Sequence, residues 1–117
     1  MTTVELGKSG EEVACKYLES QGYSIVARNF KCKAGEIDII ATELNELVFV
    51  EVKTRCSKKY GEAREAVTQV KRKHIKKATE FYLHKNKLEN QYIRFDVIEV
   101  YLKNGKFSVR HVKNTLW

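Results

Sequence analysis

Proline is absent from this 117-residue chain, and glycine occurs only six times. Long flexible linkers are usually rich in such residues, so we expect one domain over residues 1–117. No apolar run reaches the roughly 18 residues that a membrane-spanning helix needs, and the first residues lack the apolar stretch of a secretory signal. We therefore expect a protein that neither crosses a membrane nor is secreted.

Cysteine is also scarce. Cys15, Cys32 and Cys56 are an odd number, and no two of them form the close pair that is typical of a zinc site. This spacing argues against a disulfide framework as well. We interpret the three residues as reduced thiols, which predicts a protein of the cytoplasm.

Positive charge is abundant but confined to one part of the chain. Lys and Arg number 22 against 15 Asp and Glu, for a net charge of +7. The segment 53–87 contains 12 of these basic residues and three of the acids, so the rest of the chain is slightly negative. A concentrated basic surface attracts polyanions, most often nucleic acid. A lysine-rich helix face that contacts only water is the alternative.

Apolar periodicity predicts the order helix, three strands, helix, two strands. The first helix is expected over residues 7–21, with Ser9 as its N-cap and Gly22 after its end, and the second over about 62–85. The strands are expected over residues 23–30, 36–41, 47–54, 93–102 and 107–112, with turns at 43–46 and at Asn104-Gly105. This order indicates an α/β or α+β domain in which helices flank a mixed five-stranded sheet.

Three charged residues lie on two neighbouring predicted strands. Alternate residues of a strand face the same side, so Glu51 and Lys53 emerge together at the end of an otherwise apolar run. Asp38 lies on the preceding strand. If residues 43–46 join the two strands as a hairpin, Asp38 can lie close to Glu51.

Two carboxylates and one lysine suit the hydrolysis of a phosphodiester bond. Carboxylate oxygens bind Mg²⁺, which polarises the phosphate and lowers the pKa of a bound water. The lysine can orient that water or stabilise charge on the phosphate. A structural salt bridge from Lys53 to Glu51 or Asp38 would explain the same residues, and the residues alone favour neither interpretation.

Two segments resemble the halves of the PD-(D/E)xK nuclease motif: Gly35-Glu36-Ile37-Asp38, where Ile37 replaces the usual proline, and Phe49-Val50-Glu51-Val52-Lys53-Thr54. The whole chain resembles the uncharacterised bacterial YraN family, distant relatives of archaeal Holliday junction resolvases, through these segments and through Gly7-x-x-Gly10-Glu11-x-x-Ala14, Arg28-Asn29 and Arg94-Phe95-Asp96-Val97. The resemblance implies a restriction-endonuclease-like domain and a Mg²⁺- or Mn²⁺-dependent endonuclease that acts on branched or nicked DNA.

The resemblance also implies which residues form the site. The catalytic residues would be Asp38, Glu51, Lys53 and Glu11, and the metal ligands Asp38, Glu51 and Val52. Related resolvases place a glutamate of their first helix beside the metal, although Glu11 could instead be a first-turn acid that interacts with the helix dipole. Resolvases cut two strands symmetrically, so a homodimer is implied, and repair or recombination proteins are further expected partners.

Polar residues after the predicted third strand are candidates for binding nucleic acid. They lie in the following loop and on the second helix: Lys58, Lys59, Tyr60, Gln69, Lys71, Arg72, Lys73, Lys76 and Lys77. A solvated helix face is again the alternative. Two other functions stay open, a module that binds nucleic acid without cutting it and a component that is inactive until it docks on a larger complex.

The second predicted helix has an apolar stripe that includes a histidine. Its members recur at spacings of three and four: Val67, Val70, His74, Ala78 and Phe81. We therefore expect His74 in the core rather than as a ligand.

Two further acids lie in the motif segments. Asp96 is two residues from Arg94, and we expect a buried ion pair between them. Glu36 is expected to share a face with Asp38, opposite the isoleucines of the same strand, where it could assist the site or be solvated.

Overall fold

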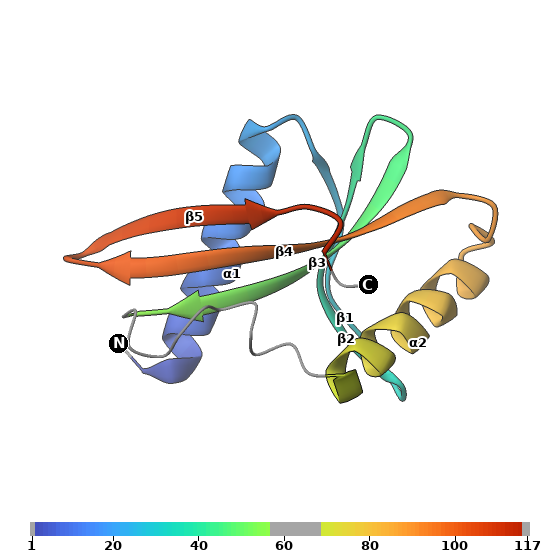
Figure 1. Ribbon diagram of the computed structural model, residues 1–117, viewed down its shortest axis with the longest axis horizontal. Coiled ribbons are helices and arrows are strands. Elements are labelled where there is room, and N and C mark those ends of the chain that lie inside the picture. Colours follow the sequence, from blue (N-terminus) through green and yellow to red (C-terminus); the bar gives the residue numbers. More distant parts are fainter. Residues whose placement is uncertain (1, 57–68, 116–117) are drawn as a thin grey trace.

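Seven helices and strands make up the described part of the chain, which is residues 2–56 and 69–115 of a computed structural model. In chain order they are α1 (Thr3–Ser20), β1 (Ser24–Cys32), β2 (Gly35–Glu43), β3 (Glu46–Arg55), α2 (Gln69–Lys85), β4 (Tyr92–Lys103) and β5 (Lys106–Val112). The strands form one sheet in the order β1-β2-β3-β4-β5. Within the described residues, β3 and β4 run parallel while the other neighbouring pairs are antiparallel, and α2 lies in the connection between β3 and β4 (Figure 1). The predicted mixed five-stranded α/β fold is confirmed.

The sheet separates two apolar layers, one under each helix. β3 contributes to both, because Leu47 and Phe49 pack with α2 on one face, while Val48 and Val50 pack with α1 on the other. An apolar, β-branched strand of this kind is typical of the buried centre of a sheet. The polar residues at the end of β3 are therefore positioned by a strand that packs against apolar side chains on both of its faces.

β2 departs from simple alternation. Ile37 packs in the layer under α2, whereas Ile39 packs in the layer under α1, so the expectation that the two share a face was wrong. Residues two apart face opposite sides only where the regular alternation of side chains along the strand is interrupted. In β2 this interruption lies at Asp38. The pairing of β2 with β3 also ends beside this point, at Ile39 and Val50.

β1 makes a matching change opposite Asp38. Its pairing with β2 joins Arg28 to Ile39 and Phe30 to Ile37, which leaves Asn29 between them, with a φ of 53°. Asparagine adopts this left-handed conformation more readily than most residues. The alternation of side chains is therefore interrupted in both strands beside Asp38, which is where the site lies.

α1 begins earlier than predicted. Its N-cap is Thr2, whose hydroxyl accepts the N–H of Glu5 at 3.1 Å while the Glu5 carboxylate accepts the N–H of Thr2 at 3.0 Å. This capping box satisfies two amides of the first turn, so Ser9 lies inside the helix rather than at its start. The Thr-x-x-Glu signal of this capping box lies before the apolar periodicity, which by itself marks only the later part of the helix. Gly22 follows the helix with a φ of 91°, as expected of a residue after a helix end.

α2 buries a different stripe from the predicted one. Val70 and Phe81 are 63% and 50% exposed, and His74 is exposed as well, so the prediction of a core histidine was wrong. Val67 and the predicted start of the helix lie outside the described residues. Two overlapping stripes exist on this helix, and the sheet selects the one formed by Ile75, Ala78, Thr79 and Tyr82.

Two features bear on the expectations from composition. Cys15, Cys32 and Cys56 are all free thiols. Within the described ranges, no helix combines the length and the apolar character that crossing a membrane requires. The cytoplasmic location stays a prediction.

Candidate functional site

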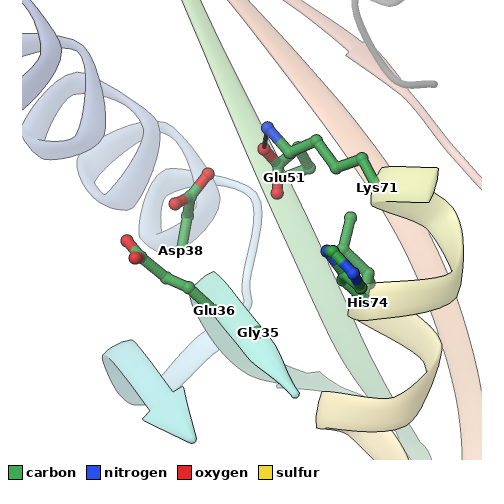
Figure 2. A pocket seen from close by; sticks show the side chains of 7 residues that line it. Gly35, Glu36, Asp38, Glu51, Lys71 and His74 are labelled. Atoms are coloured by element: carbon green, nitrogen blue, oxygen red, sulfur yellow. Dashed lines mark ion pairs between the residues drawn. The ribbon is translucent and has the colours of Figure 1, made fainter. Parts of the chain in front are cut away.

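A polar cleft opens where β2 and β3 stop pairing. Asp38 of β2 and Glu51 of β3 line a cavity of about 250 Å³, which Lys71 and His74 of α2 close on the other side (Figure 2). The hairpin that was expected at 43–46 brings the two carboxylates together, since Glu43 pairs with Glu46 and the register leads to this end of the strands.

Asp38 is held by the backbone of β3. Its Oδ2 accepts the N–H of Val52 at 2.8 Å, where a continued sheet would have a backbone carbonyl. Burial raises the pKa of Asp38 to about 7, helped by the nearby charge of Glu51, and the bond from Val52 only partly opposes this. The two carboxylates thus repel each other, which is the condition that a bound cation relieves.

Glu51 is shared by two lysines. Its side chain is 7% exposed, and its Oε1 lies 2.6 Å from Nζ of Lys71 and 3.2 Å from Nζ of Lys53. The Glu51–Lys53 salt bridge, which was the structural alternative, is therefore present. Its presence is compatible with catalysis, because a site lysine must lie near the carboxylates that it assists.

The pKa values of Lys53 and Lys71 are shifted in opposite directions in the cleft. Burial lowers the pKa of Lys53, and the neighbouring Lys71 lowers it further, against the opposing charge of Glu51. Burial also tends to lower the pKa of Lys71, but its hydrogen bonds to Glu51 and Lys53 outweigh this and raise the pKa overall. Lys53 is thus the lysine that gives up its proton more easily.

Two glycines let both helices approach the cleft. A Cβ on Gly10 of α1 would overlap the side chain of Thr54 in β3, and a Cβ on Gly35 would lie 3.0 Å from the carbonyl oxygen of His74 in α2. Close approach of α1 brings Glu11 to the same cleft, beside Asp38. The predicted site residues of α1, β2 and β3 therefore do come together.

The cleft also gathers residues that sequence reasoning had placed elsewhere. Lys71 was expected to contact phosphates but points to Glu51, and His74 lines the cleft instead of the core (Figure 2). The three-residue spacing of Lys71 and His74, which puts both on one helix face, was the available signal. Glu36 is exposed at the rim, so it is solvated and still adjacent to Asp38.

The other candidates for binding nucleic acid follow α2 away from the cleft. A shallow depression is lined by Gln69, Arg72, Lys73 and Lys76. Lys77 is exposed on the same helix. Lys58, Lys59 and Tyr60 lie outside the described residues, so their expected role stays a prediction.

Asp96 belongs to a separate polar cluster under α1. Its two carboxylate oxygens lie 3.0 and 3.1 Å from Nε and Nη2 of Arg94, so the predicted buried ion pair is present. His111 Nε2 lies 2.7 Å from the same carboxylate, which also accepts the N–H of Asn114 at 3.0 Å. Each of these contacts stabilises the ionised form, which is expected of a structural acid.

The donor atoms of the cleft suit a small hard cation. Asp38 and Glu51 offer carboxylate oxygens, and Val52, whose side chain is apolar, could add only its carbonyl oxygen. Nowhere in residues 2–56 and 69–115 do three or more His, Cys, Asp or Glu side chains gather as a ready metal site. Mg²⁺ usually takes one or two protein carboxylates and keeps several waters, so two carboxylates are sufficient.

The chain has close relatives among known proteins. The sequence model of the uncharacterised protein family UPF0102 matches residues 10–100. A UPF0102 protein of Caldicellulosiruptor saccharolyticus is 49% identical and covers 97% of this chain and 98% of its own. One from Clostridium botulinum strain Loch Maree is 47% identical over 94% of this chain and 92% of its own. A solved structure described as "Crystal structure of SSO0001" matches with 16% identity and a TM-score of 0.35, and the chain spans about half (50%) of its length.

Proposed function

This chain belongs to the UPF0102 family, the YraN family that its motifs resemble, and we propose that it is a metal-dependent endonuclease that hydrolyses phosphodiester bonds in DNA. The observation that carries the proposal is the convergence of Asp38, Glu51 and Lys53 on one cleft at the splayed ends of β2 and β3. A restriction-endonuclease-like assignment of the fold belongs to the same proposal.

In this proposal Asp38, Glu51 and the carbonyl of Val52 hold Mg²⁺ or Mn²⁺. When bound, the ion supplies a Lewis acid for the phosphate and lowers the pKa of a coordinated water. The N–H of Val52 keeps the Asp38 carboxylate in place from the side of β3. Glu11, carried in by α1, adds negative charge that strengthens the attraction for a cation.

Lys53 is suited to the proton and charge changes of hydrolysis. Its side chain is only 12% exposed, and burial together with Lys71 lowers its pKa, so its proton is given up more easily than that of a surface lysine. It can orient or help to deprotonate the attacking water, and its charged form can stabilise the phosphate.

The basic face of α2 would carry the DNA. It consists of Lys73, Lys76 and Lys77, which are exposed on the side of α2 away from the sheet, while Lys71 points into the cleft. A phosphate backbone that contacts this face would pass beside the mouth of the cleft. Preference for branched or nicked DNA, and a homodimer that presents two clefts, rest on the resemblance to the resolvases. Repair or recombination proteins are the matching partners.

One observation favours a second candidate, a nucleic-acid-binding module that does not cut. Glu51 is already neutralised by Lys53 and Lys71, so the cleft has a stable ion-pair arrangement of its own. A component that is activated only within a larger complex would fit the same contacts.

The test combines cleavage with binding. Purified protein is incubated with four-way junctions, nicked duplexes and plasmid in the presence of Mg²⁺ or Mn²⁺. Glu51→Gln, Asp38→Asn and Lys53→Met should abolish cleavage and leave DNA affinity within a few-fold of wild type, while Glu80→Gln, an exposed acid of α2, should cut normally. Tight binding without any cleavage by wild type would favour the binding module. Equal cleavage by the three site variants would point to a contaminating nuclease.

A further inference from the structure

The ammonium group of Lys71 lies at an oxygen that the proposed site needs for its cation. Its Nζ is 2.6 Å from Oε1 of Glu51, closer than the 3.2 Å that separates the same oxygen from Lys53. A carboxylate that is 7% exposed has lost most of its water and must be compensated by neighbouring charge. Lys71 supplies that compensation from α2, twenty residues along the chain from Glu51.

We infer that Lys71 is an exchangeable counter-ion, which competes with the divalent cation for Glu51 and, once displaced, binds a phosphate of the DNA. The binding of phosphate rests on the proposed function, whereas the competition for Glu51 does not. The sequence predicts only a phosphate contact for Lys71, whereas the structure places its ammonium group at the Glu51 carboxylate.

The geometry assigns this exchange to Lys71 rather than to Lys53. The Lys71 side chain is 39% exposed and reaches the cleft from the opposite helix, so it can swing towards solvent without disturbing the core. The Lys53 side chain is 12% exposed and starts on β3, two residues from Glu51. Of the two ammonium groups at Glu51, that of Lys71 is therefore the closer to solvent and the better placed to exchange.

The charges of the cleft support the exchange. When ionised, Asp38, Glu51 and Glu11 carry three negative charges against the two positive charges of Lys53 and Lys71, so a divalent ion would leave the group with a net positive charge. Displacement of the Lys71 ammonium reduces this repulsion, and a DNA phosphate at the mouth of the cleft compensates the charge that remains. Cation binding and DNA binding are therefore expected to strengthen each other.

The first experiment measures Mn²⁺ affinity by calorimetry, without DNA. Lys71→Met removes the competing charge and should bind Mn²⁺ about tenfold more tightly than wild type, whereas Lys71→Arg should stay close to wild type. Lys85→Met, an exposed lysine at the other end of α2, is the matched control and should not change the affinity. Lys71→Gln repeats the removal with a polar side chain in case the methionine variant folds poorly. Unchanged or weaker Mn²⁺ binding in both removal variants would overturn the inference.

The second experiment measures how much a divalent cation strengthens DNA binding, using Ca²⁺ and a fluorescent duplex. In wild type the gain should exceed that of Lys71→Met by several-fold, because only wild type has an ammonium to release. The same gain in both proteins would remove the phosphate step. Failure of wild type to cut any DNA would count against the proposed nuclease, yet the Mn²⁺ comparison would still decide the competition at Glu51.

Discussion

The two buried charge clusters of this protein lie on opposite faces of the same sheet and are built differently. The Asp96 carboxylate accepts hydrogen bonds from Arg94, His111 and the backbone N–H of Asn114. Burial alone would raise the pKa of Asp96, but these bonds lower it overall. Asp38 has one backbone donor and a carboxylate neighbour, and its pKa is raised to about 7. An acid whose ionised form is stabilised by several donors is typical of a structural ion pair. An acid whose pKa is raised by burial and by a neighbouring carboxylate is typical of a functional site.

The largest effect is expected where the cluster around Asp96 is broken. Arg94→Met leaves the fully buried Asp96 without its bidentate partner, and it also removes the contacts to Glu43 and Glu46. Breaking a buried pair in this way typically costs about 3–5 kcal/mol of unfolding free energy. Urea denaturation measures the loss. A loss below about 1 kcal/mol would mean that the cluster contributes little to stability.

The next effect tests how the helices are brought to the cleft. Gly10→Ala forces a methyl group against Thr54 and should reduce the unfolding free energy by about 1–3 kcal/mol, because α1 must move away from β3. Glu11 moves with the helix, so Mn²⁺ affinity should fall as well. Gly7→Ala is the matched control, since a Cβ there meets no atom within 4 Å.

The pH dependence of stability should have opposite signs in the two clusters. A group whose pKa is raised from 3.8 to about 7 on folding keeps its proton longer in the native state, so it destabilises the protein as pH rises through this range. Without divalent ions, Asp38→Asn should therefore be stabilised relative to wild type by an amount on the order of 4 kcal/mol at pH 8 and by much less at pH 4. A constant difference across this range would contradict the assignment.

Asp96 should act in the opposite direction. Its pKa is lowered on folding, so its stabilisation is complete above the ordinary aspartate pKa of 3.8 and is lost as pH falls below it. Acid unfolding curves of wild type and Asp96→Asn should converge at the lowest pH. If the difference between them persists unchanged there, the ionised form is not what stabilises the cluster.

The smallest effect is expected at a surface ion pair, which is the reference for both clusters. Arg28 and Glu12 are 3.0 Å apart, but their side chains are 40% and 52% exposed. Water screens such a pair, so Glu12→Gln should change the unfolding free energy by less than about 0.5 kcal/mol. A larger change would show that α1 depends on this contact with β1.

Much of the site followed from short-range patterns. The period of two along a strand put Glu51 and Lys53 on one face, and the polar residues 43–46 predicted the hairpin that brings Asp38 to them. Both patterns span only a few residues, so they can be recognised without knowledge of the fold. The ion pair of Arg94 and Asp96 was readable for the same reason.

Other features depended on contacts between distant segments. The rotation of α2 about its axis decides whether His74 or Ile75 is buried, and the helix offered an apolar stripe for either choice. Packing against the sheet made that choice. The interruption of the alternation of β2 at Asp38 could not be predicted either, because it accompanies a hydrogen bond from the Asp38 carboxylate to Val52 of another strand.

By itself, the sequence determined the order of the elements, the strands of the centre and the acids at their ends, because periodicity and turn chemistry are local properties. Only the tertiary structure decided that Lys71 reaches Glu51 across the cleft. It also decided that the pKa of Asp38 is raised while that of Asp96 is lowered. Charge interactions depend on distance and burial, and both are set by how two helices pack against opposite faces of one sheet.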